Sequence, residues 1–490
     1  MGSPTVFVQE TPVTTASRSQ PHAGTRAELE PVPWEVWRLA FVVVIGSFMS
    51  TLASSLINVG VKSIARSFHA PLTQTQWLSS GYIIAFAAAV PLTAWVSRRV
   101  GAGRLWLLAL TAFVIASGLC AIAPNLPVLI GLRAVQGCTG ALLLPAGQTI
   151  IGQAAGPERM GRVLNMTKIV SVLGPAAGPA LGGLLIGDLS WHWLFLVNLP
   201  VGALAITLGL RLVPRGTPQH GRPFDILGFA LIASGLPLVL YGITVISRAG
   251  GLTDPVALGT LTGGLVALGL FIGRSLTADH PLLDLRLFTN RIYTAAISSV
   301  FFTGAALLGT LILLPLYWQI LRGQGVIDTG LLMFAVGGGT AISMPLGGAL
   351  TDRTGGGPIS IVGLALSIAG VAPMVFLPAD TVFPLVLALQ AMTGFGLGLA
   401  AMPALAVAYK TVPRDRLPDA TSQANIIQRV GGSLGTALLV IMLERSGAPN
   451  VASFHTTFTW LTAASIIALG LAGWLTLEEA RRRSKTHDAQ

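Results

Sequence analysis

Long apolar runs, separated by short segments that hold most of the charged residues, follow one another from about residue 38 to residue 476. Fourteen of these runs reach about 20 residues, the length that an α-helix needs to cross a bilayer. They lie near residues 38–60, 77–97, 104–123, 127–150, 163–187, 193–213, 225–247, 255–274, 293–320, 329–351, 357–377, 381–409, 421–444 and 455–476. All are predicted to be helices, because lipid cannot bond backbone N–H and C=O groups and each segment must satisfy its own.

Composition agrees with a chain whose main solvent is lipid. Apolar residues make up 52% of the 490 positions and charged residues only 10%, against roughly 25% charged residues in soluble proteins. So few charges cannot cover a soluble fold of this size, which argues against a soluble enzyme, a nucleic-acid-binding protein and a disordered chain. Cys120 and Cys138 lie within apolar runs, where two small buried residues are expected. We expect no disulfide framework, no metal site and no cofactor.

Positive charges are distributed unevenly between the two sides of the predicted helices. If the N-terminus is cytoplasmic, 22 Lys and Arg residues fall in cytoplasmic segments and 5 in outer loops. This asymmetry follows the positive-inside rule and predicts that both termini are cytoplasmic. It also explains the net charge of +11 without a nucleic-acid partner. We expect a multi-pass protein of the plasma (inner) membrane.

An internal repeat divides the chain into two halves. The segments after the second and tenth runs share a pattern, which is Arg98-Arg99-Val-Gly101 in the first and Asp352-Arg353-Thr-Gly355 in the second. The predicted organisation is a disordered cytoplasmic tail (1–33), a six-helix bundle (34–215), two inserted helices with linkers (216–290), a second six-helix bundle (291–477) and a basic cytoplasmic tail (478–490). Halves related in this way pack around a binding site near the bilayer midplane.

The run at 163–187 carries a pattern of small residues and prolines. Its members are Gly174, Pro175, Gly178, Pro179, Gly182 and Gly183. Glycines four residues apart share one helix face and let another backbone approach closely. The prolines remove backbone donors and bend the helix. We interpret this helix as a moving contact between the two bundles; tight static packing is the alternative.

Three cations fall inside predicted helices, where a charge usually faces a cavity. Arg133, about two turns into its helix, is the strongest candidate for a functional role. Lys168 lies close enough to the cytoplasmic end to extend back to the membrane surface. For Arg429, functional and packing roles remain equally open.

Neutral polar residues could complete a polar lining around these cations. The candidates are Gln136, Asn58, Asn425 and Gln428, although each could instead make a helix-packing contact. All 19 acidic residues fall in tails, loops or helix ends, and no histidine is central. A proton-driven transporter usually keeps a titratable residue at membrane depth, and the sequence does not reveal one.

Several motifs, in order along the chain, resemble one transporter family. They are Leu52-Ala53-Ser54-Ser55-Leu56-Ile57-Asn58-Val59, Gln76-Trp77-Leu78, Arg133-x-x-Gln136-Gly137, the Gly/Pro pattern at 174–183, Trp191-His192-Trp193 through Asn198-Leu-Pro200-Val-Gly202, and Asn425, Gln428, Arg429, Gly431, Gly432 and Gly435. Over residues 40–480 the chain resembles the major facilitator superfamily, in particular its fourteen-helix drug:proton antiporter branch (QacA/EmrB-like).

The resemblance implies an all-α integral membrane protein with two six-helix bundles, two inserted helices and export by alternating access, driven by inward proton flow. By analogy, the motif around Asp352 and Arg353 gates the cytoplasmic side, and its counterpart at Arg98, Arg99 and Gly101 does the same. This chain departs from the family at two positions. Ala53 stands where the family commonly has Asp, and Arg98 stands where the superfamily pattern has Asp.

Buried cations without central acids favour neutral or anionic amphipathic substrates over lipophilic cations. The leading hypothesis is a monomeric secondary exporter in the lipid bilayer that takes small amphipathic substrates and exchanges them for protons. The alternatives are an uncoupled carrier of the same fold and a transporter-like receptor or scaffold. An enzyme or an ATP-driven pump is disfavoured, because no metal cluster, Ser-His-Asp set or nucleotide-binding loop is present in the predicted cytoplasmic segments.

Overall fold

The computed structural model describes residues 32–156, 159–160, 162–164, 178, 181–186, 189–218, 223–249, 254–444 and 450–487. Throughout these ranges the regular structure is helical. The α-helices are α1 (Trp34–Ser67), α2 (Leu72–Thr75), α3 (Trp77–Ala89), α4 (Leu92–Val100), α5 (Ala102–Ala121), α6 (Leu126–Ala155), α8 (Trp193–Leu196), α9 (Asn198–Leu212), α10 (Ile226–Ala249), α11 (Pro255–Thr277), α12 (Arg291–Leu316), α13 (Val326–Leu332), α14 (Phe334–Thr354), α15 (Gly356–Val371), α16 (Phe383–Lys410), α17 (Leu417–Glu444) and α18 (Val451–His487). Short 3-10 segments are η1 (Leu285–Thr289), η3 (Ala372–Val375) and η4 (Arg414–Arg416), and η2 (Tyr317–Leu321) is a π-helical turn.

Thirteen of the fourteen predicted membrane spans are found among the described residues. Twelve are single spans, and the thirteenth is the pair α3 and α4, bent by 56°. The bend falls at Pro91, whose ring cannot continue a helical hydrogen-bond ladder. The remaining prediction, at 163–187, lies mostly outside the described residues.

Polar residues mark where several helices begin. The side chain of Asn125 accepts a hydrogen bond from the backbone N–H of Val128 at 3.0 Å, which satisfies one free donor at the start of α6. Asp254 and Asn290 cap α11 and α12 in the same way. The sequence therefore encodes these helix starts locally, with a cap followed by an apolar run.

Helices approach one another closely where glycine removes the side chain. A β-carbon at Gly137 of α6 would collide with the carbonyl oxygen of Tyr82 in α3. A β-carbon at Gly394 of α16 would collide in the same way with the backbone of Val336 in α14. At such contacts in a membrane, close backbone approach provides the van der Waals attraction that lipid tails do not.

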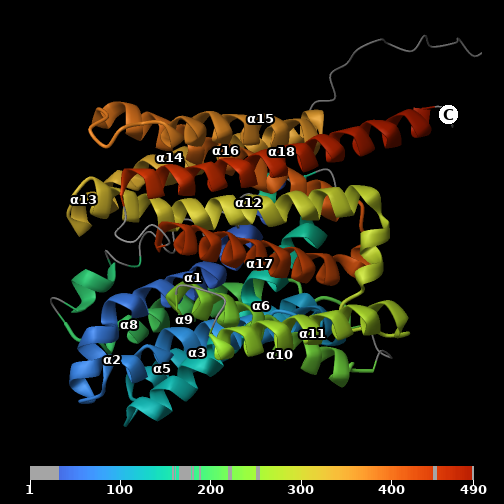
Figure 1. The fold of residues 1–490 in the computed structure, drawn as a ribbon. Coiled ribbons are helices and arrows are strands. Elements are labelled where there is room, and N and C mark those ends of the chain that lie inside the picture. The colour runs from blue at the N-terminus through green and yellow to red at the C-terminus, as the bar shows by residue number, and fades with distance from the viewer. Residues whose placement is uncertain are drawn as a thin grey trace, which may run out of the picture. The chain divides into compact units, whose positions relative to one another are not determined.

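In chain order the spans form a first set (α1–α9), an inserted pair (α10 and α11) and a second set (α12–α18), coloured from blue to red in Figure 1. At the end that holds Arg98, one buried cluster joins both sets, with Ile150 of α6, Ala296 of α12 and Leu405 of α16 among its members. At the opposite end the described core separates into one cluster around Trp191 and another around Trp318. The two sets therefore pack on each other mainly at the Arg98 end.

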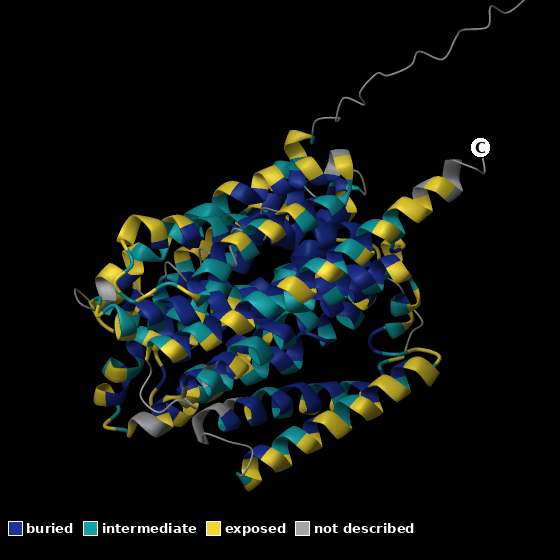
Figure 2. Cartoon of the chain, turned by 45° about the horizontal axis from the view of Figure 1, so that its top comes forward, coloured by how far each residue is buried: buried dark blue, intermediate teal, exposed yellow. Residues whose placement is uncertain are grey.

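Buried positions gather where helices face one another, and exposed positions lie on their outward sides (Figure 2). Large apolar residues are prominent among the exposed ones. On α11, for example, Leu265, Val266 and Leu270 are each more than half exposed. Such a surface is stable only in lipid, as the apolar runs predicted.

We predict that Gly137→Ala lowers the thermal unfolding midpoint of the detergent-purified protein. The added methyl group must displace α3, an overpacking that typically costs about 1–3 kcal/mol. Gly131→Ala is the matched control on the same helix, because a β-carbon there meets nothing within 4 Å. It should leave the midpoint unchanged or raise it, since alanine favours a helix over glycine. Equal midpoints for the two variants would contradict this packing.

Candidate functional site

Arg133 lies in a buried pocket between α6 and α3, where two of its three guanidinium nitrogens donate hydrogen bonds. Its side chain is 1% exposed, its Nε donates to the carbonyl oxygen of Leu78 at 3.2 Å, and one Nη donates to Gln136 Oε1 at 2.6 Å. Gln136 in turn donates to Ser117 Oγ on α5. The guanidinium also lies 4.3 Å from the centre of the Tyr82 ring. The predicted pair Arg133 and Gln136 thus joins three helices of the first set.

Tyr82 connects this pocket to α1. Its hydroxyl donates to the carbonyl oxygen of Ser50 at 3.0 Å and lies 3.0 Å from the Ser50 hydroxyl. Gly140 allows this contact, because a β-carbon there would lie 2.6 Å from Ser50 Oγ. Spacing within the Arg-x-x-Gln-Gly motif therefore follows from the packing of α1, α3 and α6.

Arg429 approaches the same helix from the second set. Its guanidinium lies 4.0 Å from the centre of the Phe86 ring, one helical turn after Tyr82 on α3. The two rings are 6.1 Å apart. One arginine thus lies against each of two neighbouring rings of α3. This is a favourable cation–π arrangement when the cation is desolvated. Arg429 makes no hydrogen bond or ion pair with any residue that the structure describes.

Carboxylates do not accompany these arginines within the described ranges. The acids that are buried there are Asp225 and Asp419. Asp225 pairs with Arg274 at 2.6 Å, where α10 begins and α11 ends, and Asp419 pairs with Arg98. Neither of these two buried acids pairs with Arg133 or Arg429.

The other polar residues predicted to line the site lie in different parts of the structure. Asn58 is exposed on α1 and accepts a hydrogen bond from Ser79 at 2.9 Å. Asn425 donates to Gln148 Oε1 at 2.7 Å and so joins α17 to α6. Gln428 lies where α17 meets α12, and a β-carbon at Gly304 would be 2.6 Å from its carbonyl oxygen. Arg133, Arg429 and Asn58 therefore contact α3, whereas Asn425 and Gln428 face other helices.

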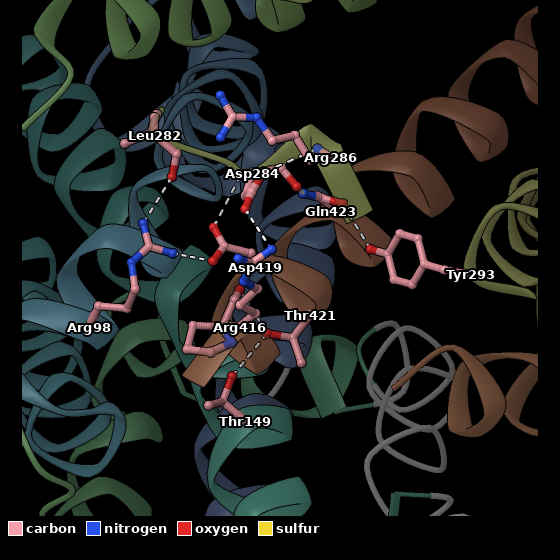
Figure 3. A network of polar contacts seen from close by, with 11 residues as sticks. Arg98, Thr149, Leu282, Asp284, Arg286, Tyr293, Arg416, Asp419, Thr421 and Gln423 are labelled. Atoms are coloured by element: carbon pink, nitrogen blue, oxygen red, sulfur yellow. Dashed lines mark hydrogen bonds and ion pairs between the residues drawn. The ribbon is translucent and has the colours of Figure 1, made fainter. Parts of the chain in front are cut away.

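A second polar network joins the two sets at the Arg98 end (Figure 3). The guanidinium of Arg98, at the end of α4, forms an ion pair with Asp419, at the start of α17. Arg98 is 6% exposed and Asp419 1% exposed. Arg98 also donates to the carbonyl oxygen of Leu282 at 3.3 Å, in the linker between α11 and α12. We call this ion pair and its partners the Arg98 clamp.

Further contacts surround the pair within the clamp. Asp284 donates its backbone N–H to Asp419 at 3.4 Å, and its carboxylate pairs with Arg416 at 3.2 Å. Gln423 donates to the carbonyl oxygen of Asp284 at 2.9 Å and accepts from the Tyr293 hydroxyl at 2.8 Å. Close by, the Thr149 and Thr421 hydroxyls lie 2.9 Å apart, from α6 and α17 respectively.

Asp419 was not identified from the sequence as a partner for Arg98, which lies 321 residues earlier. One signal could have found it. An arginine at the position where the superfamily has an acid reverses the local charge, and a buried reversed charge needs an opposite partner. Local periodicity cannot indicate which acid supplies that partner.

The repeated motif after α4 and α14 is a matching pair of turns. Gly101 has φ 93° and Gly355 has φ 98°, a region in which glycine is favoured. Arg99 is exposed, and the side chains of Asp352 and Arg353 lie outside the described residues. The gating role of these positions remains a prediction.

The described part of the Gly/Pro helix lies against α1. A β-carbon at Gly178 would collide with Ser55, and one at Gly182 would be 3.2 Å from Val59, whereas Gly183 meets nothing within 4 Å. Both close approaches are therefore within the first set. Gly174, Pro175, Pro179 and Lys168 lie outside the described residues, so the moving contact between bundles remains a prediction.

The expectation for the cysteines was half wrong. Cys120 is buried, but Cys138 is exposed on α6. It shares a helix face with Gly131 and with Val135, which is 51% exposed, because residues four and then three positions apart point the same way. An apolar run does not reveal which of its faces a neighbouring helix covers.

An apolar cavity of about 330 Å³ lies between α12, α17 and η1. Its lining residues are Phe288, Ile297, Ser298, Phe301, Phe302 and Ile427. Its volume is at the lower end of the range for small-molecule sites, about 300–1,000 Å³. The walls offer one hydroxyl and otherwise apolar contacts.

Two sets of membrane-spanning helices, joined at one end by a buried ion pair, define a polytopic membrane transporter. The family model for the Major Facilitator Superfamily matches residues 43–436, and the chain belongs to this superfamily. The recognition made from the motifs is thereby confirmed. Members of this superfamily are transporters and not enzymes.

The chain is similar to several bacterial proteins over most of its length. It is 34% identical over 435 residues to "Multidrug resistance protein B homolog" of Mycobacterium tuberculosis strain H37Rv, covering 88% of this chain and 80% of that protein. It is 28% identical over 446 residues to "Putative multidrug resistance protein MdtD" of Escherichia coli strain 536, covering 89% and 93%. These relatives agree with the drug:proton antiporter branch.

Solved structures share the fold. The human organic anion transporter MFSD10 superposes with a TM-score of 0.62 at 15% identity, covering 90% of this chain and 100% of that chain. The proton:xylose symporter XylE gives the same TM-score and identity, with 89% and 94% covered. At this identity the likeness shows the fold alone.

We predict that Arg98→Gln and Asp419→Asn each lower the unfolding free energy of the purified protein by about 3–5 kcal/mol, because each leaves a buried charge without its partner. The double variant should lose less than the sum of the two. Arg481→Gln is the control. It breaks an exposed pair with Glu478, and its effect should stay within about 1 kcal/mol. Additive losses in the double variant would show that Arg98 and Asp419 do not stabilise each other.

Proposed function

We propose that this chain is a secondary exporter of the plasma membrane that works by alternating access and exchanges protons for neutral or anionic amphipathic substrates. The observation that carries the substrate preference is the pair of arginines, from α6 and α17, that lie against two rings of α3. Arg133 and Arg429 lie 4.3 and 4.0 Å from the Tyr82 and Phe86 ring centres, and no described carboxylate is buried with them. Such a region repels lipophilic cations and attracts electron-rich groups.

The direction of transport is inferred from the relatives and from charge placement. Two relatives carry multidrug-resistance names, and export is the activity that such names imply. The excess of Lys and Arg on one side supports cytoplasmic termini, with the Arg98 clamp at the cytoplasmic face. The proposed bundles are residues 34–215 and 291–477, with the helices of 216–290 inserted between them.

The Arg98 clamp suggests how the cytoplasmic side closes. It joins α4, α17 and the linker before α12 around one buried ion pair. Opening toward the cytoplasm requires that this pair separate, while the less connected opposite end closes. A two-state element of this kind is what alternating access requires.

The proposed proton coupling does not use the acidic residue that is usual in helix 1 of this family. Ala53, 4% exposed on α1, stands where the family commonly has Asp, so the usual titratable group is absent there. An uncoupled uniporter of the same fold is therefore the alternative function, and this substitution is the observation that favours it.

We predict that, in proteoliposomes with an imposed pH gradient, adding a neutral or anionic amphiphile starts a flux of protons down that gradient. Internal pH and substrate should be followed together, with protein-free liposomes as the control. Substrate movement without proton flux would establish the uniporter instead. Export of ethidium or quaternary ammonium that Arg133→Ala abolishes, with no export of anions, would contradict the substrate preference.

We predict that breaking the clamp exposes its buried neighbours to the cytoplasm. In a protein with Cys120 and Cys138 replaced by alanine, Ala420→Cys should react slowly with a water-soluble maleimide, because Ala420 is fully buried beside Asp419. Adding Arg98→Gln should speed the reaction several-fold as the inward-open population rises.

Ala306→Cys is the control for this labelling experiment, since Ala306 is buried in the second set at the opposite end. Its labelling rate should not rise with Arg98→Gln. Equal acceleration at both positions would indicate general loosening of the fold, and no acceleration at Ala420 would contradict the gate.

A further inference from the structure

Arg429 holds unused hydrogen-bonding capacity at membrane depth. It lies about midway along α17, and its guanidinium has five N–H donors. None of these donors bonds to a residue that the structure describes. Among the described residues, the guanidinium lies against the face of the Phe86 ring. A charged side chain in a spanning segment is costly, and such residues commonly mark a substrate or ion pathway.

Arg133 differs from Arg429 in its burial and in its hydrogen bonds, which decide whether a ligand can reach the guanidinium. Two of its nitrogens already donate to Leu78 and Gln136, and it is 1% exposed. Arg429 is only partly buried. The guanidinium of Arg429 is therefore the more accessible of the two, while Arg133 holds α6 against α3.

The Phe86 ring that Arg429 faces lies in an apolar cluster. Phe86 and Ile426 belong to one buried cluster with Leu236 of α10, and Val430 packs against it. Arg133 lies against the adjacent ring, Tyr82, and the buried acids Asp225 and Asp419 are committed to other arginines. A ligand that satisfied Arg429 would need one anionic group and an apolar body.

We propose that Arg429 binds the carboxylate of an aromatic or lipid-like organic acid, whose apolar part lies against Phe86 and its neighbours. A carboxylate matches the guanidinium fork with two parallel hydrogen bonds and neutralises its charge. The proposal rests on the exporter function proposed above and adds that, within its substrate class, monocarboxylic amphiphiles are recognised through their carboxylate. It also assigns recognition of the anion to Arg429 and not to Arg133.

The test compares naphthalene-1-carboxylate with its uncharged amide in proteoliposomes. Wild-type protein should transport both. Arg429→Gln should raise the KM for the acid at least about tenfold, the loss expected for hydrogen bonds to a charged group, and leave the amide within about twofold. Arg429→Lys should retain part of the preference, because it keeps the charge but not the fork. Arg211→Gln, which removes an exposed arginine from α9, should change neither KM.

Continued transport of the amide shows that the Arg429 variant is folded and active. An equal loss of acid and amide transport would overturn the proposal, since Arg429 would then serve the fold or the transport cycle. An unchanged acid KM would overturn it as well. Equilibrium dialysis of the labelled acid against purified wild type and Arg429→Gln separates binding from transport. If wild type binds the acid tenfold more tightly than the variant but moves neither compound, the site stands and the exporter function fails.

Discussion

The buried ion pair between Arg98 and Asp419 is the contact on which the arrangement of the two helix sets depends. Both side chains are shielded from water, so separating them exposes two charges to a poorly solvating environment unless water enters. The pair recruits the linker before α12 through Leu282 and Asp284. The inserted helices are thereby tied to the same junction, because that linker leads from α11 into the second set.

The bent pair α3 and α4 connects this junction to the candidate substrate site. Its first segment carries the rings of Tyr82 and Phe86, against which Arg133 and Arg429 lie, and its second segment ends in Arg98. Pro91 separates the two segments by a 56° bend. One broken span thus contacts the first set, the second set and the clamp. In the proposed mechanism, a change at the rings and a change at the clamp act on the same helix pair.

Predictions for individual polar residues were less successful than predictions for helices. Arg133 and Arg429 were recognised as unusual, but their different environments were not, because acceptors such as the Leu78 carbonyl come from another helix. Asn425, expected near the arginines, bonds to Gln148 across the two sets. Cys138 was expected to be buried and is exposed. In each case the partner, or its absence, depends on how helices distant in the sequence pack.

The sequence by itself determined the number and approximate positions of nearly all described spans, the turns at Gly101 and Gly355, and the family. These follow from local physics, since each segment in lipid must satisfy its own backbone and a turn at positive φ favours glycine. Only the tertiary structure decided that Asp419 pairs with Arg98, that Arg133 is enclosed, and that Arg429 donates no hydrogen bond to any described residue. Pairing of buried charges depends on which helix faces meet, and no periodicity along one segment carries that information.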